Sequence, residues 1–405
     1  MRRGGLVVLL GVIAATGDAS AQDSSIRMQC PTATALHPTG DGIKCAHLVG
    51  GDGMVTMADD QSTPLYVFGF SPVPTGGPEV NSAEYPGWVM ENGTLAANAP
   101  GPTIAVDEDD ELFLTLTNAG MAMRPDLFDA HSVHWHGFPQ AASIFDGVPD
   151  SSIAINMGAS FTYYYNVKDA GTYLYHCHVE AAEHMQMGML GNLYVRPRQN
   201  HLPDGTDLNG FVHHDGYTYA YNDGDGSTRY DVEFPVQIST FDPDFHDASF
   251  AVQPLPFAGM RDTYFMLNGR SYPDTTDPSV LSTVDPLGKT QYSQPVSTLI
   301  SATAGQRVLL RISNVSVTQF STLATNGIPM RVVALDARLL RDDAGHDLSY
   351  QTHSLTLGGG QSADVILDTT GFTPGSTYFL YTTNLHQLAN DAENFGGLMT
   401  EIRIK

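Results

Sequence analysis

The chain has 405 residues and a formal net charge of −25 at pH 7. Its 40 glycines, 24 prolines and small share of charged residues are typical of a turn-rich all-β protein with two or three domains. The strongly negative charge argues against a nucleic acid or an anionic membrane surface as partner.

The amino terminus has the features of a secretory signal. A short apolar run extends from Leu6 to Ala15, after Arg2 and Arg3 and before the small residues Ala19 to Ala21. This pattern predicts a signal peptide over residues 1–21 and export to the periplasm or the extracellular space. The two arginines leave twin-arginine export open beside the general secretory route. The run is too short to span a membrane, and we expect no other membrane span in the sequence.

Short strand-like runs follow an irregular start. Residues 22–60 are interpreted as an irregular lead-in. From Pro64 onward, β-branched and aromatic residues alternate with polar ones between turn residues, which predicts strands. With two histidine-rich strands, these runs predict one β-sandwich domain over residues 61–198. The runs are Leu65 to Phe70, Thr103 to Val106, Glu111 to Asn118, Ser160 to Val167 and Gly191 to Pro197.

The two histidine-rich motifs are the most informative feature of this domain. The first covers residues 131–137, with the sequence HSVHWHG, and the second is His176-Cys177-His178. Successive side chains of a strand point to opposite faces. His134 and His136 therefore share a face, and Cys177 points away from the histidines on either side of it. One strand can then serve two metal sites, with the cysteine backbone joining them.

A ligand set for blue copper surrounds the second motif. Cys177 offers a soft thiolate, His184 an imidazole and Met189 a weak axial thioether. The second imidazole comes from His131.

The second half of the chain looks like a degenerate repeat of the first. Residues 199–229 are rich in Asp, Gly, Asn and Tyr, and we interpret them as a linker. In the domain predicted over residues 230–405, the segment 300–314 parallels 103–118, and 375–384 parallels the strand that carries Cys177.

The copper ligands are missing from this copy. Tyr381, Thr382 and Thr383 stand at the positions of the His-Cys-His motif. Residues 327–333 are expected where the histidine strand should be, and they contain no histidine. We therefore predict that the second domain lacks type 1 copper ligands.

Both motifs resemble those of the multicopper oxidase family of cupredoxins, H-x-x-H-x-H-G and H-C-H followed by H-x3-G-M. The resemblance implies an all-β fold with two cupredoxin-like Greek-key β-sandwich domains. It implies type 1 copper on His131, Cys177, His184 and Met189. It also implies a type 2/type 3 copper site on His134, His136, His176 and His178. One departure is the stretch from Val179 to Glu183, which is longer than in laccases and predicts a longer loop beside the blue site.

With Cys177 assigned to copper, two cysteines remain. Cys30 and Cys45 are expected to pair as a disulfide within the lead-in, in an oxidising compartment. Two free thiols are the alternative reading.

The resemblance implies a laccase-like, copper-dependent oxidoreductase. A small-molecule or protein donor would lose single electrons at type 1 copper, and oxygen would be reduced at the second copper site. Asp146 follows the histidine strand and is a candidate proton relay. An aspartate in a turn before glycine is an equally good interpretation of the same residue.

The second domain supplies too few ligands for a complete laccase-type cluster. Its histidines are scattered and form no His-x-His pair. Two-domain members of the family build the cluster between the subunits of a homotrimer, so the resemblance favours a homotrimer here.

Two alternatives remain open. Copper nitrite reductases are two-domain trimers too, and His136 and His176 match two of their type 2 copper ligands, with His353 or His386 as a third. Against this, His134 occupies the position of their catalytic aspartate. The other alternative is a blue-copper electron carrier without catalysis, which has no use for the histidines on the opposite face.

Overall fold

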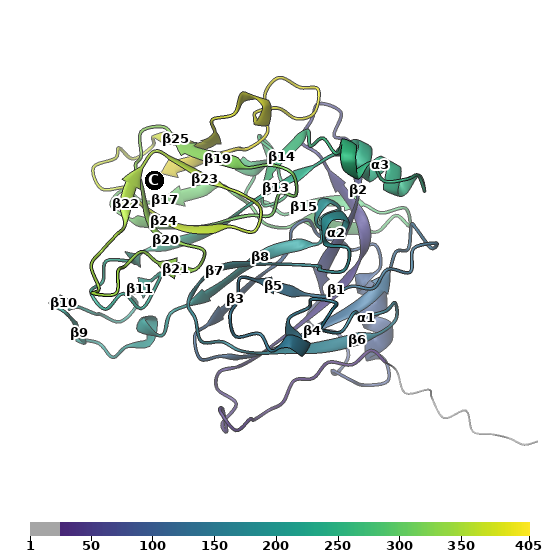
Figure 1. The fold of residues 1–405 in the computed structure, drawn as a ribbon, viewed down its shortest axis with the longest axis horizontal. Helices are drawn as coiled ribbons and strands as arrows, with labels where there is room; N and C mark the ends of the chain where they lie inside the picture. Colours follow the sequence, from purple (N-terminus) through teal and green to yellow (C-terminus); the bar gives the residue numbers. More distant parts are fainter. Residues whose placement is uncertain (1–24) are drawn as a thin grey trace, which may run out of the picture.

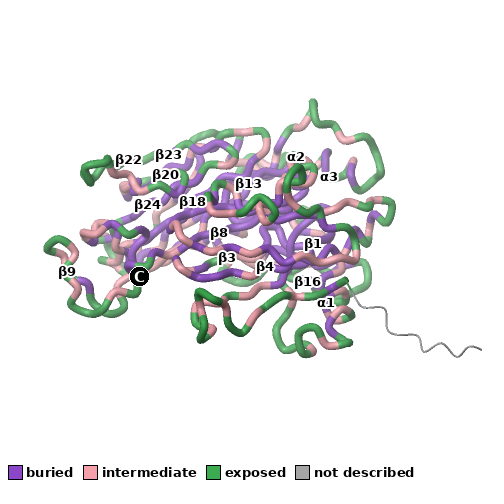
Figure 2. Tube along the Cα trace, turned by 60° about the horizontal axis from the view of Figure 1, so that its bottom comes forward, coloured by how far each residue is buried: buried purple, intermediate pink, exposed green. Residues whose placement is uncertain are grey.

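The computed structural model describes residues 25–405, so the signal peptide expected over residues 1–21 lies outside the described residues. The described chain forms two β-sandwiches that pack against each other (Figure 1). Buried strands occupy the middle of the molecule, and the exposed segments are mostly loops around them (Figure 2). No helix within residues 25–405 is long and apolar enough to cross a membrane.

The first sandwich consists of two four-stranded sheets, ordered β2-β1-β4-β6 and β3-β8-β7-β5. Its strands are β1 (Ile43–Thr56), β2 (Pro64–Pro72), β3 (Gly101–Asp107), β4 (Glu111–Gly120), β5 (His134–His136), β6 (Ser160–Asn166), β7 (Gly171–His176) and β8 (Leu190–Arg196). Two helices accompany them, α1 (Tyr85–Gly93) and α2 (Ala181–Gln186). The strands predicted from sequence alternation are all present, within a few residues of the expected bounds.

The lead-in is less irregular than the sequence indicated. Its second half forms β1, which pairs in parallel with β4 and antiparallel with β2 and so lies inside the sheet. The prediction that the first domain begins at residue 61 was therefore wrong. Three glycines in this strand hide its apolar pattern, and a register shift at Gly50/Gly51 interrupts the alternation. Cys45 on this strand forms the predicted disulfide with Cys30.

The second sandwich repeats the pairing of the first. Its sheets are ordered β14-β13-β18-β24-β20-β21, with β22 also on β20, and β17-β26-β25-β19-β23. The strands are β13 (Val232–Phe241), β14 (Tyr264–Leu267), β17 (Ile300–Ala302), β18 (Arg307–Asn314), β19 (Ser321–Thr325), β20 (Met330–Leu335), β21 (Arg338–Leu339), β22 (Tyr350–Thr352), β23 (Ser354–Leu357), β24 (Ser362–Asp368), β25 (Thr377–Thr382) and β26 (Met399–Ile404). Helix α3 (Pro243–Phe250) and the hairpin of β15 (Leu281–Val284) and β16 (Thr290–Gln294) are added to this core.

The repeat corrects one alignment made from sequence. In the first sandwich β7 lies between β8 and β5, and in the second β25 lies between β26 and β19. The counterpart of the histidine strand is therefore β19, and the expectation for residues 327–333 was wrong, because that segment leads into β20 in the other sheet. Strand β19 contains no histidine either, so the predicted absence of ligands holds for the correct strand.

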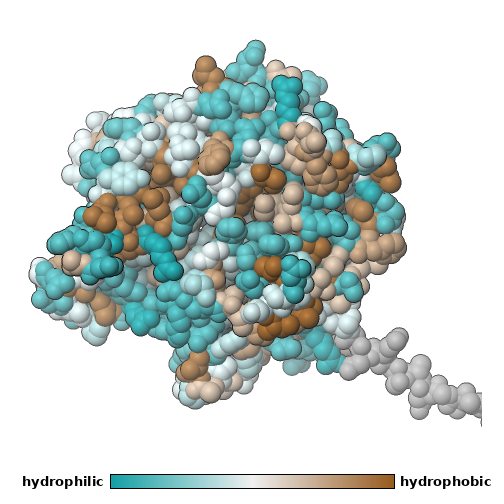
Figure 3. Space-filling model, in the orientation of Figure 1, coloured by the Kyte–Doolittle hydropathy of each residue, from teal (hydrophilic) through white to brown (hydrophobic). Residues whose placement is uncertain are grey.

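The linker is an ordered part of the structure. Residues 199–229 contain β9 (Asp207–Leu208), β10 (Phe211–Val212) and β11 (Thr218–Tyr219), and β12 (Arg229–Tyr230) follows at its end. Ala220 and Tyr221 are buried against the second sandwich, so this segment is more than a surface loop. Hydrophilic residues cover much of the face shown in Figure 3, with apolar residues in small groups among them.

A buried charged cluster joins the two sandwiches. Arg311 on β18 is 1 % exposed, and its Nε donates to Glu233 at 2.9 Å while Nη1 lies 3.6 Å from the Asp364 carboxylate. The Thr172 hydroxyl of β7 donates to Asp364 at 2.5 Å, which ties the first sandwich to the second. Buried charges persist only when they are paired, and each charged group here has an opposite charge within 4 Å, although Nη2 of Arg311 has no hydrogen-bond partner.

Replacing Arg311 by Met tests this cluster. The variant leaves Asp364 buried without its cation, while Glu233 keeps Arg196 at 2.6 Å, so we expect the free energy of unfolding to fall by about 3–5 kcal/mol. Denaturant unfolding measures the change. Arg403→Met is the control, since Arg403 pairs with Glu401 at the surface, and such a pair contributes about 1 kcal/mol or less. Equal losses in the two variants would contradict the analysis.

Candidate metal centres

The first cluster brings together His131, Cys177 and His184. One ligand atom from each lies within 4.8 Å of the other two. The three residues come from the loop before β5, the end of β7 and helix α2, and all three are 0 % exposed. His184 Nδ1 lies 3.2 Å from Cys177 Sγ. The structure thus assembles three of the four residues proposed for type 1 copper.

Unpaired nitrogen atoms show that this cluster suits a metal ion. Neither ring nitrogen of His131 has a hydrogen-bond partner within the described chain. Buried polar atoms are almost always hydrogen-bonded, because burial without a partner costs free energy. A soft thiolate and two buried imidazoles form a donor set that fits copper.

The electrostatics favour a thiolate at Cys177. Burial alone would raise the pKa of this thiol, but the neighbouring His184 and His131 lower it well below its usual range. Burial likewise opposes a charge on His184, yet the Cys177 thiolate and the Asp129 carboxylate raise the pKa of that imidazole to about 10. The proton on His184 therefore supplies positive charge next to the thiolate, and a bound copper ion would supply it instead.

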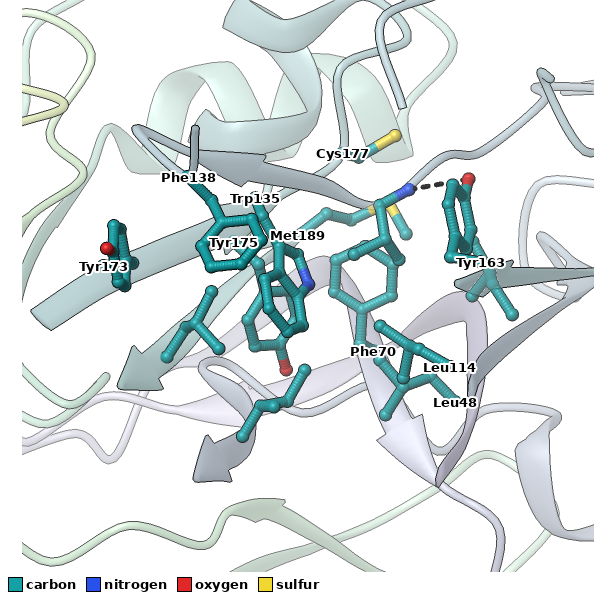
Figure 4. Close-up of a cluster of buried hydrophobic side chains, with 14 of the residues drawn as sticks. Leu48, Phe70, Leu114, Trp135, Phe138, Tyr163, Tyr173, Tyr175, Cys177 and Met189 are labelled. Carbon is teal, nitrogen blue, oxygen red and sulfur yellow. Dashed lines mark hydrogen bonds between the residues drawn. The ribbon is translucent and has the colours of Figure 1, made fainter. Parts of the chain in front are cut away.

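Met189 and the unforeseen Gly50 complete the surroundings of the first cluster. Met189 is 0 % exposed, and its backbone carbonyl accepts from Cys177 N at 3.0 Å. A Cβ atom on Gly50 would lie 3.0 Å from His131 Cδ2 and 3.2 Å from the methyl carbon of Met189. Because Gly50 has no side chain, the backbone of β1 lies directly against the side chains of His131 and Met189. Figure 4 shows Cys177 and Met189 at one edge of the aromatic core.

Asp129 is a second residue that the sequence analysis missed. Its Oδ2 lies 3.7 Å from His184 Nε2, on the side of the ring away from Cys177. Carboxylates commonly orient the free nitrogen of a metal-binding histidine. The pairing joins residues 55 positions apart in the chain through a loop, and no local pattern in the sequence indicates it.

The second cluster lies on the other side of the same chain segment. Ligand atoms of His134, His136 and His176 lie within 4.8 Å of one another. The ring of His178 is 5.0 Å from that of His134 and 5.5 Å from that of His176, measured between centroids. All four predicted imidazoles are therefore gathered.

Backbone carbonyls orient two of these imidazoles. His134 Nδ1 lies 2.6 Å from the Asp146 carbonyl oxygen, and His176 Nδ1 lies 2.8 Å from that of Cys177. Each contact occupies Nδ1 and leaves Nε2 for a metal. Burial lowers the pKa of His176 to about 3 and also lowers the pKa of His134 and of His136, so these rings are in the neutral form that binds metals. The Asp146 carboxylate is 3.4 Å from His134, and its role as a relay stays a prediction.

A cavity of about 390 Å³ opens beside the second cluster, between the two sandwiches. His136, His176 and His178 line it on one side, and residues 315–320 with Gly359 and Gly360 line it on the other. Within the described chain, the second sandwich adds no imidazole to either cluster. His386 packs on the Phe265 ring instead, and neither it nor His353 lines the cavity.

Comparison with known proteins agrees with this arrangement. A family model described as multicopper oxidase matches residues 85–200, and a second with the same description matches residues 253–398. The two matches together cover more than half of the chain. The chain belongs to the multicopper oxidase family. Copper is the cofactor that this family implies.

Two relatives and one solved structure are similar to parts or most of this chain. A multicopper oxidase of Talaromyces pinophilus is 36 % identical over 103 residues, which are 25 % of this chain and 16 % of the relative. An L-ascorbate oxidase of Cucumis sativus is 33 % identical over 144 residues, 33 % of this chain and 23 % of the relative. The blue copper oxidase of Nitrosomonas europaea shares the fold, with a TM-score of 0.61, 21 % identity and coverage of 89 % of this chain and 86 % of that one. The chain spans less than a quarter of the length of both curated relatives.

Gly360 provides a test of the second cluster. A Cβ atom there would lie 2.7 Å from His136 Nε2, so we expect Gly360→Ala to weaken copper binding at the second cluster about tenfold or more. Copper titration of the purified protein, followed by spin resonance, measures this.

Gly375→Ala is the matched control for this variant. Gly375 has φ +85°, close to the +86° of Gly360, but nothing lies within 4 Å of its added Cβ atom. Both variants carry the same backbone strain, and only Gly360→Ala presses on an imidazole. Equal copper affinities at the second cluster in the two variants would disprove the role of His136.

Proposed function

We propose that the chain is a copper-dependent oxidoreductase of the laccase-like kind, which takes single electrons from a donor and passes them to oxygen. The observation that carries this proposal is the use of one segment by two clusters. Cys177 contributes to the first cluster, and His176 and His178 contribute to the second. An electron carrier would need only the first cluster.

The residues divide the work between the two sites. His131, Cys177, His184 and Met189 would hold type 1 copper, and His134, His136, His176 and His178 would hold type 2/type 3 copper. When bound, copper would supply one-electron transfer at the first site and reduction of oxygen at the second. Complete burial of Cys177 keeps water from the thiolate, and its carbonyl fixes the ring of His176. The peptide unit that joins His176 to Cys177 is a direct covalent connection between the two sites.

The cavity beside the second cluster is suited to a small acceptor. It reaches the imidazoles of His136, His176 and His178. Val315 and Leu174 give it an apolar wall. Such a site admits oxygen and leaves it in contact with the metal-binding face. The donor is a small molecule or a redox protein, and it approaches the first cluster.

Two further properties belong to the proposal. The Cys30–Cys45 disulfide supports export to an oxidising compartment, in keeping with the amino-terminal signal. A homotrimer would allow a neighbouring subunit to add the ligands that the second sandwich of the same chain does not provide.

A nitrite reductase-like enzyme is the second candidate. Ligand atoms of His134, His136 and His176 lie within 4.8 Å of one another, and three such imidazoles suffice for a single type 2 copper. A copper nitrite reductase of Nitrosomonas europaea shares the fold, with a TM-score of 0.55 and 16 % identity, covering 89 % of this chain and 94 % of that one. His134 counts against it, because an acidic residue is expected at that position.

The blue site is tested by Cys177→Ser. Wild-type protein loaded with Cu(II) should show an intense visible band from the thiolate–copper bond, and the variant should lose it completely, because a hydroxyl is not a soft donor. Absorption spectra of equally loaded samples decide the matter. A colourless wild type would contradict the assignment.

Copper counting decides between the enzyme types. Copper per subunit, spin resonance and oligomer mass are measured together on wild type, His134→Ala and His178→Ala. We expect a coupled copper pair beside the blue and the type 2 signals in a trimer, and loss of coupling in both variants. One blue and one type 2 copper would support the nitrite reductase-like reading. A single copper, unchanged by either substitution, would show an electron carrier and overturn the enzyme proposal.

A further inference from the structure

A buried carboxylate of the second sandwich lies between the two metal-binding regions. Asp262 is 0 % exposed, and no Lys or Arg side chain of the described residues forms an ion pair with it. It accepts hydrogen bonds from Gln186 Nε2 at 2.9 Å, from the Thr240 hydroxyl at 2.9 Å and from the Thr318 hydroxyl. A buried carboxylate without a cation is costly, so these three bonds are what hold it in place.

Two of the donors belong to opposite sides of the candidate site. Gln186 is the last residue of α2, between His184 and Met189. Thr318 belongs to the loop that lines the cavity beside the second cluster. One carboxylate therefore binds the type 1 loop, here defined as residues 184–189, and the cavity wall, here defined as residues 315–320.

Helix α2 itself faces both regions. His184 points to Cys177, while Ala182 and Met185 line the cavity. A shift of this short helix would thus move a ligand of the first cluster and the wall of the second together. The hydrogen bond from Gln186 to Asp262 fixes the end of the helix against the second sandwich.

A second contact holds the same point of the chain. His246 on α3 is 0 % exposed, with one ring nitrogen 2.5 Å from the Tyr66 carbonyl oxygen and the other 2.9 Å from the Gln186 carbonyl oxygen. Helices α2 and α3 lie side by side in both views (Figure 1 and Figure 2). Gln186 is therefore held through its side chain by Asp262, and its backbone carbonyl lies against the buried ring of His246.

We propose that Asp262 is a positioning residue for both copper sites, which holds the type 1 loop and the cavity wall in a fixed relation across the interface between the sandwiches. This inference rests on the proposed function, because it takes the two clusters as copper sites. Asp262 touches neither cluster and acts through Gln186 on one side and Thr318 on the other. Its loss should change two sites that a purely structural carboxylate would leave alone.

Three variants separate the two arms of this network. Gln186→Leu removes the arm to the type 1 loop, Thr318→Val removes the arm to the cavity wall, and Asp262→Asn weakens both. The first readouts are the visible band and the reduction potential of type 1 copper. The others are the melting temperature and the affinity for azide, a small anion that would bind copper held by the second cluster.

Each variant has its own expected result. Gln186→Leu should shift the type 1 band and potential, and it should change azide affinity less than Thr318→Val does, since only Ala182 and Met185 of the same helix line the cavity. Thr318→Val should change azide affinity roughly two- to tenfold and leave the type 1 signals unchanged. Asp262→Asn should do both. If Asp262→Asn does not fold, the two single-arm variants decide the question.

Asp364→Asn is the matched control. Asp364 is also 0 % exposed and also bridges the sandwiches, through Thr172 and Tyr221, but it contacts neither the type 1 loop nor the cavity wall. It should lower the melting temperature and leave the band and the azide affinity as in wild type. The proposal is overturned if Asp262→Asn behaves like this control, or if both single-arm variants match wild type. Failure of azide to bind the wild type would count against the proposed second copper, while the type 1 readouts would still test the arm through Gln186.

Discussion

The two metal centres depend on the register between β5 and β7. His134 pairs with His176, Trp135 with Tyr175 and His136 with Leu174. This register sets the histidines of β5 beside the end of β7, from which Cys177 leaves toward the opposite side. A slip by one residue would put Trp135 on the histidine face and His134 and His136 into the core. Both clusters would then be lost, although every ligand would still be in the sequence.

Hydrophobic packing holds this register. Trp135 is 0 % exposed and stacks on Tyr165, with ring centroids 3.9 Å apart, and Tyr175 is equally buried in the same core (Figure 4). Burying an aromatic side chain of this size contributes about 2–3 kcal/mol, so a slipped register would forfeit several such terms. The geometry of the polar ligands is thus enforced by apolar neighbours on the other face of the same strands.

Much of this arrangement could be read from the sequence, because alternation in a strand is a local property. The two faces of the His-Cys-His segment and most strands of the first sandwich were predicted in that way, whereas the disulfide was predicted from the two cysteines left once Cys177 was assigned to copper. Strand β1 was missed because its glycines carry no apolar signal, and β19 because a short strand without ligands has no signature. Asp129 and Asp262 act across long distances in the chain, so only the folded structure shows what they contact.

The internal repeat shows how a site is lost while its frame is kept. In the second sandwich, Thr382 stands on β25 at the position of Cys177, and its hydroxyl donates to Gln387 Oε1 at 2.9 Å. The equivalent region of the first sandwich leaves the nitrogens of His131 without partners. A polar position that has lost a metal must find a hydrogen bond, and Thr382 has one. The unpaired nitrogens of His131 therefore fit the proposed metal site, while the second sandwich contributes residues 315–320 to the wall of the cavity.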